Sequence, residues 1–391
     1  MVMLCFSLPM PRQVSTIFIA VVMLLWVLEG NFTKRLQMLN NRYFFISISL
    51  YVLYGIGLIY TENLKSGWFE MEQKLSMLIF PLLFFTTAID QISVKKMLRG
   101  FVLGCAVAAL ICWVNSCYNY YLTGEKEVFL YAKLSLFMHV SYFAMYLCFA
   151  VVILLFNDQI VKGRLTKMLL LLFFGVTIIL LSSKSGVISL ALILVIKIIH
   201  DVVVNKQYFK ATIATLLILF TASMSYILFP KTFDRFKEMK LSISGNSKEL
   251  DSTTGRVHVW KHAVSLIAKH PIAGVGTGDV KDELKKRYKA QNEQLLIEKE
   301  LNAHNQFLQT GIALGFPGAI FLLGLLLIVA IQTIRNELLV GSFLLLLTVI
   351  NFLFESMLET QSGVVFIYFF MMLFFSIAVK KPNKNNTFAS T

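Results

Sequence analysis

The chain alternates between long apolar runs and short polar connections over most of its 391 residues. A helix needs about 20 mostly apolar residues to cross the hydrocarbon core of a bilayer, and fewer when flanking side chains reach the interface. By this measure the pattern predicts eleven membrane-spanning helices, and therefore an all-α, polytopic helix bundle. The expected spans are 14–28, 43–60, 75–89, 101–122, 136–156, 168–181, 186–204, 209–229, 306–333, 338–354 and 363–379.

Composition supports a membrane protein and excludes several other classes. Hydrophobic residues make up 57% of the chain and charged residues only 15%, which excludes a soluble globular domain and a disordered chain. The net charge of +14 comes from short clusters dispersed between the apolar runs, which is typical of topology signals rather than of a nucleic-acid interface. The five cysteines lack the spacing of metal ligands and are expected to be ordinary buried thiols.

The basic residues also predict an orientation. One set of alternate connections carries 16 Lys and Arg residues, whereas the other set carries six when its long loop is left out. By the positive-inside rule the first set faces the cytoplasm. The predicted organisation is therefore an N-terminal bundle of about eight spans (1–229), a large folded periplasmic loop (230–303), C-terminal spans (304–379) and a cytoplasmic tail (380–391).

The predicted outer loop contains an amphipathic helix. Between residues 256 and 269, Val257, Trp260, Val264 and Ile267 recur at helical spacing, and the following His-Pro pair predicts the end of the helix. We expect this helix to rest on the membrane surface or on the bundle. His258 and His262 are one helical turn apart and could share a metal ion, but no third ligand accompanies them, so two surface histidines are expected instead.

Two further stretches of the loop have alternative interpretations. Residues 274–278 (GVGTG) lack the preceding strand of a dinucleotide site and are expected to form a tight turn, with phosphate binding by the backbone as the alternative. Residues 281–300 are rich in both signs of charge and include Lys285, Lys286, Arg287 and Lys289. They are expected to form a solvated helix face, with contact to an anionic lipid or a glycan as the alternative.

The segment that opens the next span carries a recognisable signature. His304-Asn305 is followed by nine residues and then by Gly315-Phe316-Pro317-Gly318. This pattern resembles the His-Asn, nine residues, Gly-x-x-Gly signature of the bacterial O-antigen ligase and O-antigen polymerase superfamily. The upstream Arg256, Trp260 and residues 270–276 (HPIAGVG) resemble a second block of that family. Residues 182–186 (SSKSG) resemble a third, with Lys184 where the family usually has arginine.

The resemblance implies a function. Members of this superfamily transfer a glycan from undecaprenyl diphosphate to an acceptor sugar on the periplasmic side of the inner membrane. Their fold is similar to that of helical, GT-C-like glycosyltransferases, which need neither a metal nor a cofactor. The expected partners are therefore the lipid-linked donor, membrane lipids and an acceptor such as lipid A-core, a glycan or a protein. Ligase is the first interpretation and polymerase of O-antigen or exopolysaccharide repeat units the second, while a polytopic transporter or flippase would leave His304 without a role.

The residue types fit this chemistry. Histidine suits the removal of a proton from the acceptor hydroxyl, because its ordinary pKa of about 6.5 is close to neutral pH. Arg256 and Lys184 are the candidates for holding the donor diphosphate, since arginine bonds two phosphate oxygens at once and lysine acts as a point charge. The alternatives are a Lys184 that reaches the membrane boundary and an Arg256 that only pairs with Asp251.

Secondary candidates lie around the same signature. Asn305 follows the histidine, and Glu355 and Glu359 occupy the outer connection before the last span, where they could orient His304 or bind sugar hydroxyls. Glu70, Glu72 and Lys74 lie in another outer connection, and the sequence assigns them no role. On an ideal helix His304 and the three glycines would fall within about 40° of one another. Such a stripe predicts close helix packing or a lipid groove at Gly311, Gly315 and Gly318.

Overall fold

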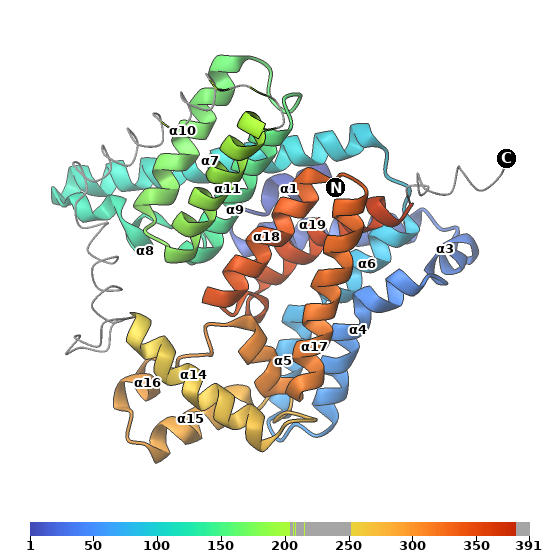
Figure 1. The fold of residues 1–391 in the computed structure, drawn as a ribbon, viewed down its shortest axis with the longest axis vertical. Coiled ribbons are helices and arrows are strands. Elements are labelled where there is room, and N and C mark those ends of the chain that lie inside the picture. Colours follow the sequence, from blue (N-terminus) through green and yellow to red (C-terminus); the bar gives the residue numbers. More distant parts are fainter. Residues whose placement is uncertain (204–205, 207, 209–214, 216–251, 381–391) are drawn as a thin grey trace. The chain divides into compact units, whose positions relative to one another are not determined.

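The computed structural model describes residues 1–203, 206, 208, 215 and 252–380 (Figure 1). Every regular element of these residues is a helix, and they contain no strand, so the predicted all-α class is confirmed for this part of the chain. The predicted span at 209–229 lies outside the described residues except for residue 215. Residues 230–251 of the predicted outer loop and the tail from residue 381 also lie outside them.

The described helices include five that are long and apolar enough to cross a membrane. A bent pair, α2 (Arg12–Leu28) with α3 (Phe32–Leu39), makes a sixth candidate if its two arms, which meet at 112°, form one span. The chain is therefore a membrane protein, but the described helices do not reach the predicted number of eleven spans. The five are α4 (Arg42–Ile59), α7 (Gln91–Thr123), α11 (Lys184–Val203), α17 (Gln306–Arg335) and α19 (Gln361–Lys380).

Several predicted spans form helices that are too short to meet this test. The run expected at 75–89 forms α6 (Ser76–Thr86), whose 11 residues cover only about 16 Å at 1.5 Å per residue. The apolar helices α9 (Val140–Phe156) and α18 (Leu339–Phe354) contain 17 and 16 residues. These runs are helical, as predicted, but their lengths do not by themselves confirm that they cross the membrane, because an apolar helix can also be buried inside a bundle.

The remaining helices are α1 (Val2–Ser7), α5 (Leu64–Lys74), η1 (Lys126–Phe129), α8 (Tyr131–Leu134), α10 (Arg164–Leu180), α14 (Ser252–Lys269), α15 (Val280–Ala290), α16 (Gln294–Glu298) and η2 (Met357–Glu359).

The chain divides into two compact units. Unit 1 comprises Met1–Val22 and Gln91–Thr254. Its centre is α9, which is apolar all round and buried along nearly its whole length between α7, α10 and α11. The short α1 packs closely along α7, where a Cβ at Gly100 would lie 2.9 Å from the carbonyl oxygen of Val2. Glycine at this position therefore permits the contact between the two helix backbones.

Unit 2 comprises Met23–Asp90 and Gly255–Thr391. Helix α19 packs against α6, α17 and α18, and α4 packs against α6 and α17. Aromatic rings fill this bundle: Phe369 lies edge-on to Phe80 and Phe84, with centroids 5.2 and 5.1 Å apart. Helices α14, α15 and α16 gather at the end of the bundle where α17 begins (Figure 1). That end brings most of the predicted site residues together.

Helix α14 ends at Lys269, as the sequence predicts, but its buried face differs from the predicted one. Val257 and Val264 are 44% and 57% exposed, so they do not pack against the bundle, whereas Ile267 of the same predicted stripe is buried. The buried side chains of this helix are Val259, His262, Ala263, Leu266 and Ile267. The helix thus packs against unit 2 through a face that is rotated from the expected one.

The long helix α17 is broken at Gly315, where φ is 68° and ψ is −168°. The break leaves two carbonyl groups without their usual donors, because the N–H of Phe316 bonds to Pro271 (2.8 Å) and Pro317 has no N–H. The loop before α15 supplies the replacements: Val275 N–H donates to Ile312 (2.8 Å) and Gly276 N–H to Ala313 (3.1 Å). The loop therefore completes the hydrogen bonding of the broken helix.

Candidate active site

His304 lies in the short loop that enters α17, in a backbone conformation with φ of 44°. Its N–H donates to the side chain of Asn302 over 3.0 Å. The indole N–H of Trp260 donates to the carbonyl of Ala303 over 2.9 Å and so ties this loop to α14. Asn305 is the N-cap of α17, since its side chain accepts the N–H of Leu308 over 3.1 Å. The secondary candidate Asn305 therefore has an observed structural task beside His304.

A buried carboxylate holds the imidazole. Nδ1 of His304 lies 2.7 Å from Oε1 of Glu355, whose side chain is only 7% exposed, while the His304 side chain is 23% exposed. A carboxylate can only accept a hydrogen bond, so the neutral imidazole carries its proton on Nδ1 in this contact. The lone pair of Nε2 is then the basic one. This arrangement matches the orientation of a catalytic base by a third group.

Arg256 completes this cluster on unit 2. Its guanidinium Nη2 lies 3.9 Å from Oε2 of Glu355, so one carboxylate faces both the imidazole and a cation. The Arg256 side chain is 20% exposed and remains accessible to a ligand. The alternative partner, Asp251, lies outside the described residues. The structure therefore brings together His304, Glu355 and Arg256 of the predicted site.

Lys184 belongs to unit 1. It is the first residue of α11 and is 8% exposed. The preceding turn includes Ser182 at φ 50°, and the hydroxyl of Ser183 accepts the N–H of Gly186 over 3.3 Å. The predicted turn in residues 182–186 is confirmed, and Lys184 is more buried than a side chain that extends to the membrane boundary.

Glu359 lies apart from the imidazole, in a second buried cluster. Its carboxylate bonds to Nζ of Lys74 over 3.0 Å and to the amide of Gln306 over 3.3 Å. Lys74 is 1% exposed and also pairs with Glu70. Burial raises the pKa of Glu70 to about 7, against the opposing pull of Lys74 and with a further rise from the charge of Glu359. The pKa of Glu359 is lowered: burial acts to raise it, but Lys74 and the hydrogen bonds of the cluster outweigh that effect.

Sequence reasoning assigned no role to Glu70 or Lys74. Their spacing of four residues on one helix is a signal for an ion pair, but such pairs usually lie on a solvated surface. Only the contact with η2, which lies 285 residues further along the chain, shows that this pair is buried. A lysine in a predicted outer connection therefore becomes the centre of a buried cluster.

The three signature glycines do not share one straight stripe. His304 precedes the helix, and the break at Gly315 changes the direction of α17, so the prediction made for an ideal helix is wrong. Gly311 lies under Ile267 of α14, where an added Cβ would be 2.9 Å from its Cδ1. A Cβ at Gly315 would lie 2.6 Å from the carbonyl oxygen of Pro271. Two of the glycines therefore admit the segment around residues 267–272, and Gly318 lies against Leu314 of its own helix.

The alternative of a phosphate site in the loop 274–278 is not supported by its hydrogen bonds. The N–H groups of Val275 and Gly276 donate to α17, and that of Gly278 donates to Thr61 over 3.2 Å. A positive φ at Gly274 and Gly276 confirms the predicted tight turn. These amides are engaged within the protein, so they stabilise the fold rather than offer themselves to an anion.

His258 and His262 share one carboxylate. Nδ1 of His258 lies 2.8 Å from one oxygen of Glu293, and Nε2 of His262 lies 2.6 Å from the other. Burial acts to raise the pKa of Glu293, but the hydrogen bonds from the two histidines outweigh it and lower the pKa. His262 is 4% exposed, so the expectation of two surface histidines is wrong for this residue. The distant Glu293 was missed because only the fold places α14 beside it.

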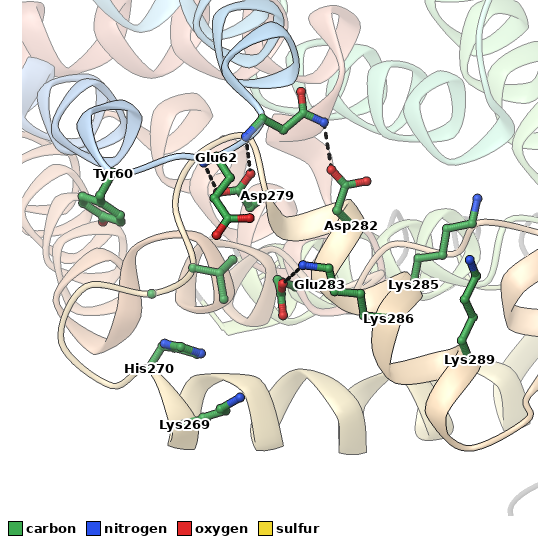
Figure 2. A pocket seen from close by; sticks show the side chains of 13 residues that line it. Tyr60, Glu62, Lys269, His270, Asp279, Asp282, Glu283, Lys285, Lys286 and Lys289 are labelled. Atoms are coloured by element: carbon green, nitrogen blue, oxygen red, sulfur yellow. Dashed lines mark hydrogen bonds and ion pairs between the residues drawn. The ribbon is translucent and has the colours of Figure 1, made fainter.

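A cavity of about 740 Å³ lies between the end of α14, the turn at residues 60–63 and α15 (Figure 2). Asp279 closes one wall by accepting the N–H groups of Glu62 and Asn63, each over 2.8 Å. Asp282 accepts the side-chain amide of Asn63 over 2.8 Å, and Glu283 pairs with Lys286 over 2.6 Å. The walls of this cavity therefore carry both positive and negative charges. Asp279 and Asp282 connect the start of α15 to the turn between α4 and α5.

The predicted charged helix at 281–300 forms α15 and α16. Lys281 and Lys285 both pair with Glu300, over 2.6 and 3.0 Å, and both of these lysines are exposed. These contacts agree with the expected solvated helix face. Lys285 and Lys289 line the cavity of about 740 Å³ on its basic side (Figure 2).

Comparison with known proteins agrees with the signature. A search of the curated proteins finds no match for this chain. A family model described as O-antigen ligase matches residues 168–323, a segment that includes Lys184, Arg256 and His304 but ends before Glu355. The resemblance found in the sequence is thereby confirmed: this segment is similar to the O-antigen ligase family.

Proposed function

We propose that this protein is an O-antigen ligase-like glycosyltransferase. It moves a glycan from undecaprenyl diphosphate to a hydroxyl group of an acceptor such as lipid A-core. The observation that carries the proposal is the cluster of His304, Glu355 and Arg256: a histidine fixed by a buried carboxylate 2.7 Å away, with a guanidinium beside it. The family match and the apolar helices support a glycan transferase of the membrane.

The proposed reaction assigns a task to each charged group. Nε2 of His304 takes the proton of the acceptor hydroxyl as that oxygen bonds to the anomeric carbon of the donor glycan. The bond between this carbon and the diphosphate oxygen breaks, and the diphosphate leaves with the electron pair. Glu355 stabilises the imidazolium that forms, while Arg256 and Lys184 neutralise the diphosphate. The cations thereby replace the charge neutralisation that a metal ion supplies in other transferases.

We propose that this chemistry takes place on the periplasmic side of the inner membrane. The basic residues of alternate connections support that orientation through the positive-inside rule. Transfer on this side suits a donor whose glycan is already attached to a lipid carrier. A fold similar to the helical, GT-C-like glycosyltransferases is part of the same proposal.

The test uses purified protein in proteoliposomes with a labelled undecaprenyl-diphosphate-linked glycan. His304→Ala should abolish transfer while the protein still inserts, and His200→Ala, a histidine of unit 1, should retain it. Arg256→Lys should weaken the use of donor more than Lys184→Arg, because the first change removes a planar fork and the second adds one. Activity retained by His304→Ala would exclude the base, and an unchanged KM for donor in Arg256→Lys would exclude the diphosphate contact.

Polymerisation of repeat units is the alternative within the same family, because the shared motifs do not identify the acceptor. Offering lipid A-core and lipid-linked repeat units separately distinguishes the two: ligase activity yields glycan on the core, whereas polymerase activity yields longer lipid-linked chains. A transporter or flippase would give labelled donor on the opposite leaflet and no covalent product.

A further inference from the structure

A second cavity of unit 2 lies beside the loop that carries His304. Its volume is about 360 Å³, at the small end of ligand pockets, which range from roughly 300 to 1,000 Å³. Asn302 of the loop before α17, Gln309 of α17 and Glu359 of η2 line it, together with Phe69, Glu70 and Gln73 of α5. Asn302 also accepts the N–H of His304 over 3.0 Å, so this wall adjoins the proposed base.

The cavity contains hydrogen-bond donors without partners. Gln309 is 7% exposed, and its side-chain oxygen accepts the N–H of Ala303 over 3.1 Å. Its amide nitrogen has no acceptor among the described residues. The side-chain amide of Asn302 likewise donates to no group within the described part. Both residues line the cavity, so their amides are available to donate hydrogen bonds to a ligand that accepts them.

The cavity also presents hydrogen-bond acceptors. The carboxylates of Glu70 and Glu359 are 21% and 12% exposed, and both contact the buried ammonium of Lys74. Lys74 lies 4.8 Å from the ring of Tyr54 and is fixed between these groups, so it orients the two carboxylates. Each carboxylate retains lone pairs beyond its contact with Lys74 and, for Glu359, beyond the hydrogen bond from the amide of Gln306. Hydroxyl groups, which both donate and accept, complement this mixture of amides and carboxylates.

Charge separates the possible occupants. Glu70 and Glu359 face one buried lysine, and the exposed Glu300 pairs with Lys281 over 2.6 Å at the same cavity. Carboxylates outnumber ammonium groups here, which disfavours a diphosphate. A neutral sugar is not repelled by these carboxylates. Phe69 is 56% exposed and offers an apolar ring face of the kind that packs against the C–H face of a sugar.

We propose that this cavity binds a sugar residue of the acceptor glycan and presents it beside His304. This inference rests on the proposed function: a sugar bound beside His304 is the acceptor because His304 is the base that removes the proton from its hydroxyl. Glu70, Glu359, Asn302 and Gln309 bond the hydroxyls, and Phe69 packs against the ring. The donor diphosphate then occupies the side of His304 on which Arg256 lies.

Binding is tested first without catalysis. Saturation-transfer difference NMR on the full chain, in a detergent without a sugar headgroup, uses the methyl glycosides of glucose, galactose and N-acetylglucosamine as probes. At least one should bind to the wild type, and Phe69→Ala and Glu70→Gln should each weaken it by about tenfold or more. Trp68→Ala and Glu72→Gln are matched controls on the same helix, because both residues are exposed and neither lines the cavity.

The outcomes distinguish this inference from the proposed function. His304→Ala should bind the glycoside as the wild type does, because it leaves the cavity intact. If the wild type binds a glycoside, the two cavity variants do not, and the wild type shows no transfer activity, the sugar site is supported and the transferase is rejected. Transfer activity without glycoside binding, or equal binding by cavity and control variants, would overturn the sugar site alone. In the transfer assay, Phe69→Ala should raise KM for the acceptor about tenfold with kcat nearly unchanged.

Discussion

Replacing Glu355 by glutamine tests the proposed role of the buried carboxylate. The change keeps the size of the side chain but removes its charge 2.7 Å from Nδ1 of His304. A hydrogen bond between an imidazolium and a carboxylate contributes about 1.5–3 kcal/mol, and the imidazolium exists only after His304 has taken the proton. Since about 1.4 kcal/mol corresponds to a factor of ten in rate, Glu355→Gln should lower kcat by roughly 10- to 150-fold.

Single-turnover transfer at saturating acceptor measures this effect directly. Glu72→Gln, an exposed substitution of the same type, serves as control and should stay close to the wild type. An unchanged kcat in Glu355→Gln, or a change in acceptor KM with kcat intact, would refute the orientation of His304 by Glu355.

Three other substitutions test the fold and the buried cluster. Gly315→Ala should destabilise the protein by about 1–3 kcal/mol and lower its Tm, because φ is 68° and the new Cβ meets Pro271; Gly324→Ala, in open space on the same helix, should not. Glu70 has a pKa raised from 4.5 to about 7, so the folded state binds more protons in that interval and loses stability as the pH rises through it. Thermal melts should therefore show a fall in Tm from pH 4.5 to 7 that is smaller in Glu70→Gln. Trp260→Phe should lower kcat by releasing the loop at Ala303 while circular dichroism stays unchanged.

The sequence predicts the helical class and the membrane setting, because apolar runs leave few other structures available in lipid. It does not predict how many of these runs cross the bilayer. Helix α6 reads as a span from hydropathy, yet it contains only 11 residues. Hydropathy reports only how unfavourable contact with water is for a segment. Other helices remove an apolar helix from water as well as lipid does, so hydropathy cannot distinguish the two environments.

The candidate site was predictable where its residues are close in the sequence or carry a signature, and not where the fold joins distant segments. His304 and Arg256 follow from the motif. The contact of His304 with Glu355 spans 51 residues, and the sequence offered two acidic candidates without a means to choose between them. Glu359 instead faces Lys74, a contact that no local pattern encodes.

The two glycine-containing blocks of the sequence act as one structural element. Pro317 cannot donate a hydrogen bond, and Phe316 donates to Pro271, so α17 has two carbonyl groups to satisfy at its break. The loop at 274–276 approaches closely enough to satisfy them only because Gly274 has no Cβ, which would otherwise lie 2.5 Å from the N–H nitrogen of Leu314. The loop therefore supplies the N–H donors that the broken helix lacks, and α17 supplies carbonyl acceptors for those N–H groups. This mutual dependence fixes α17 against the segment that follows α14. His304 lies in the loop before α17 and Arg256 lies on α14, so the packing of these two helices helps to hold both side chains near one carboxylate.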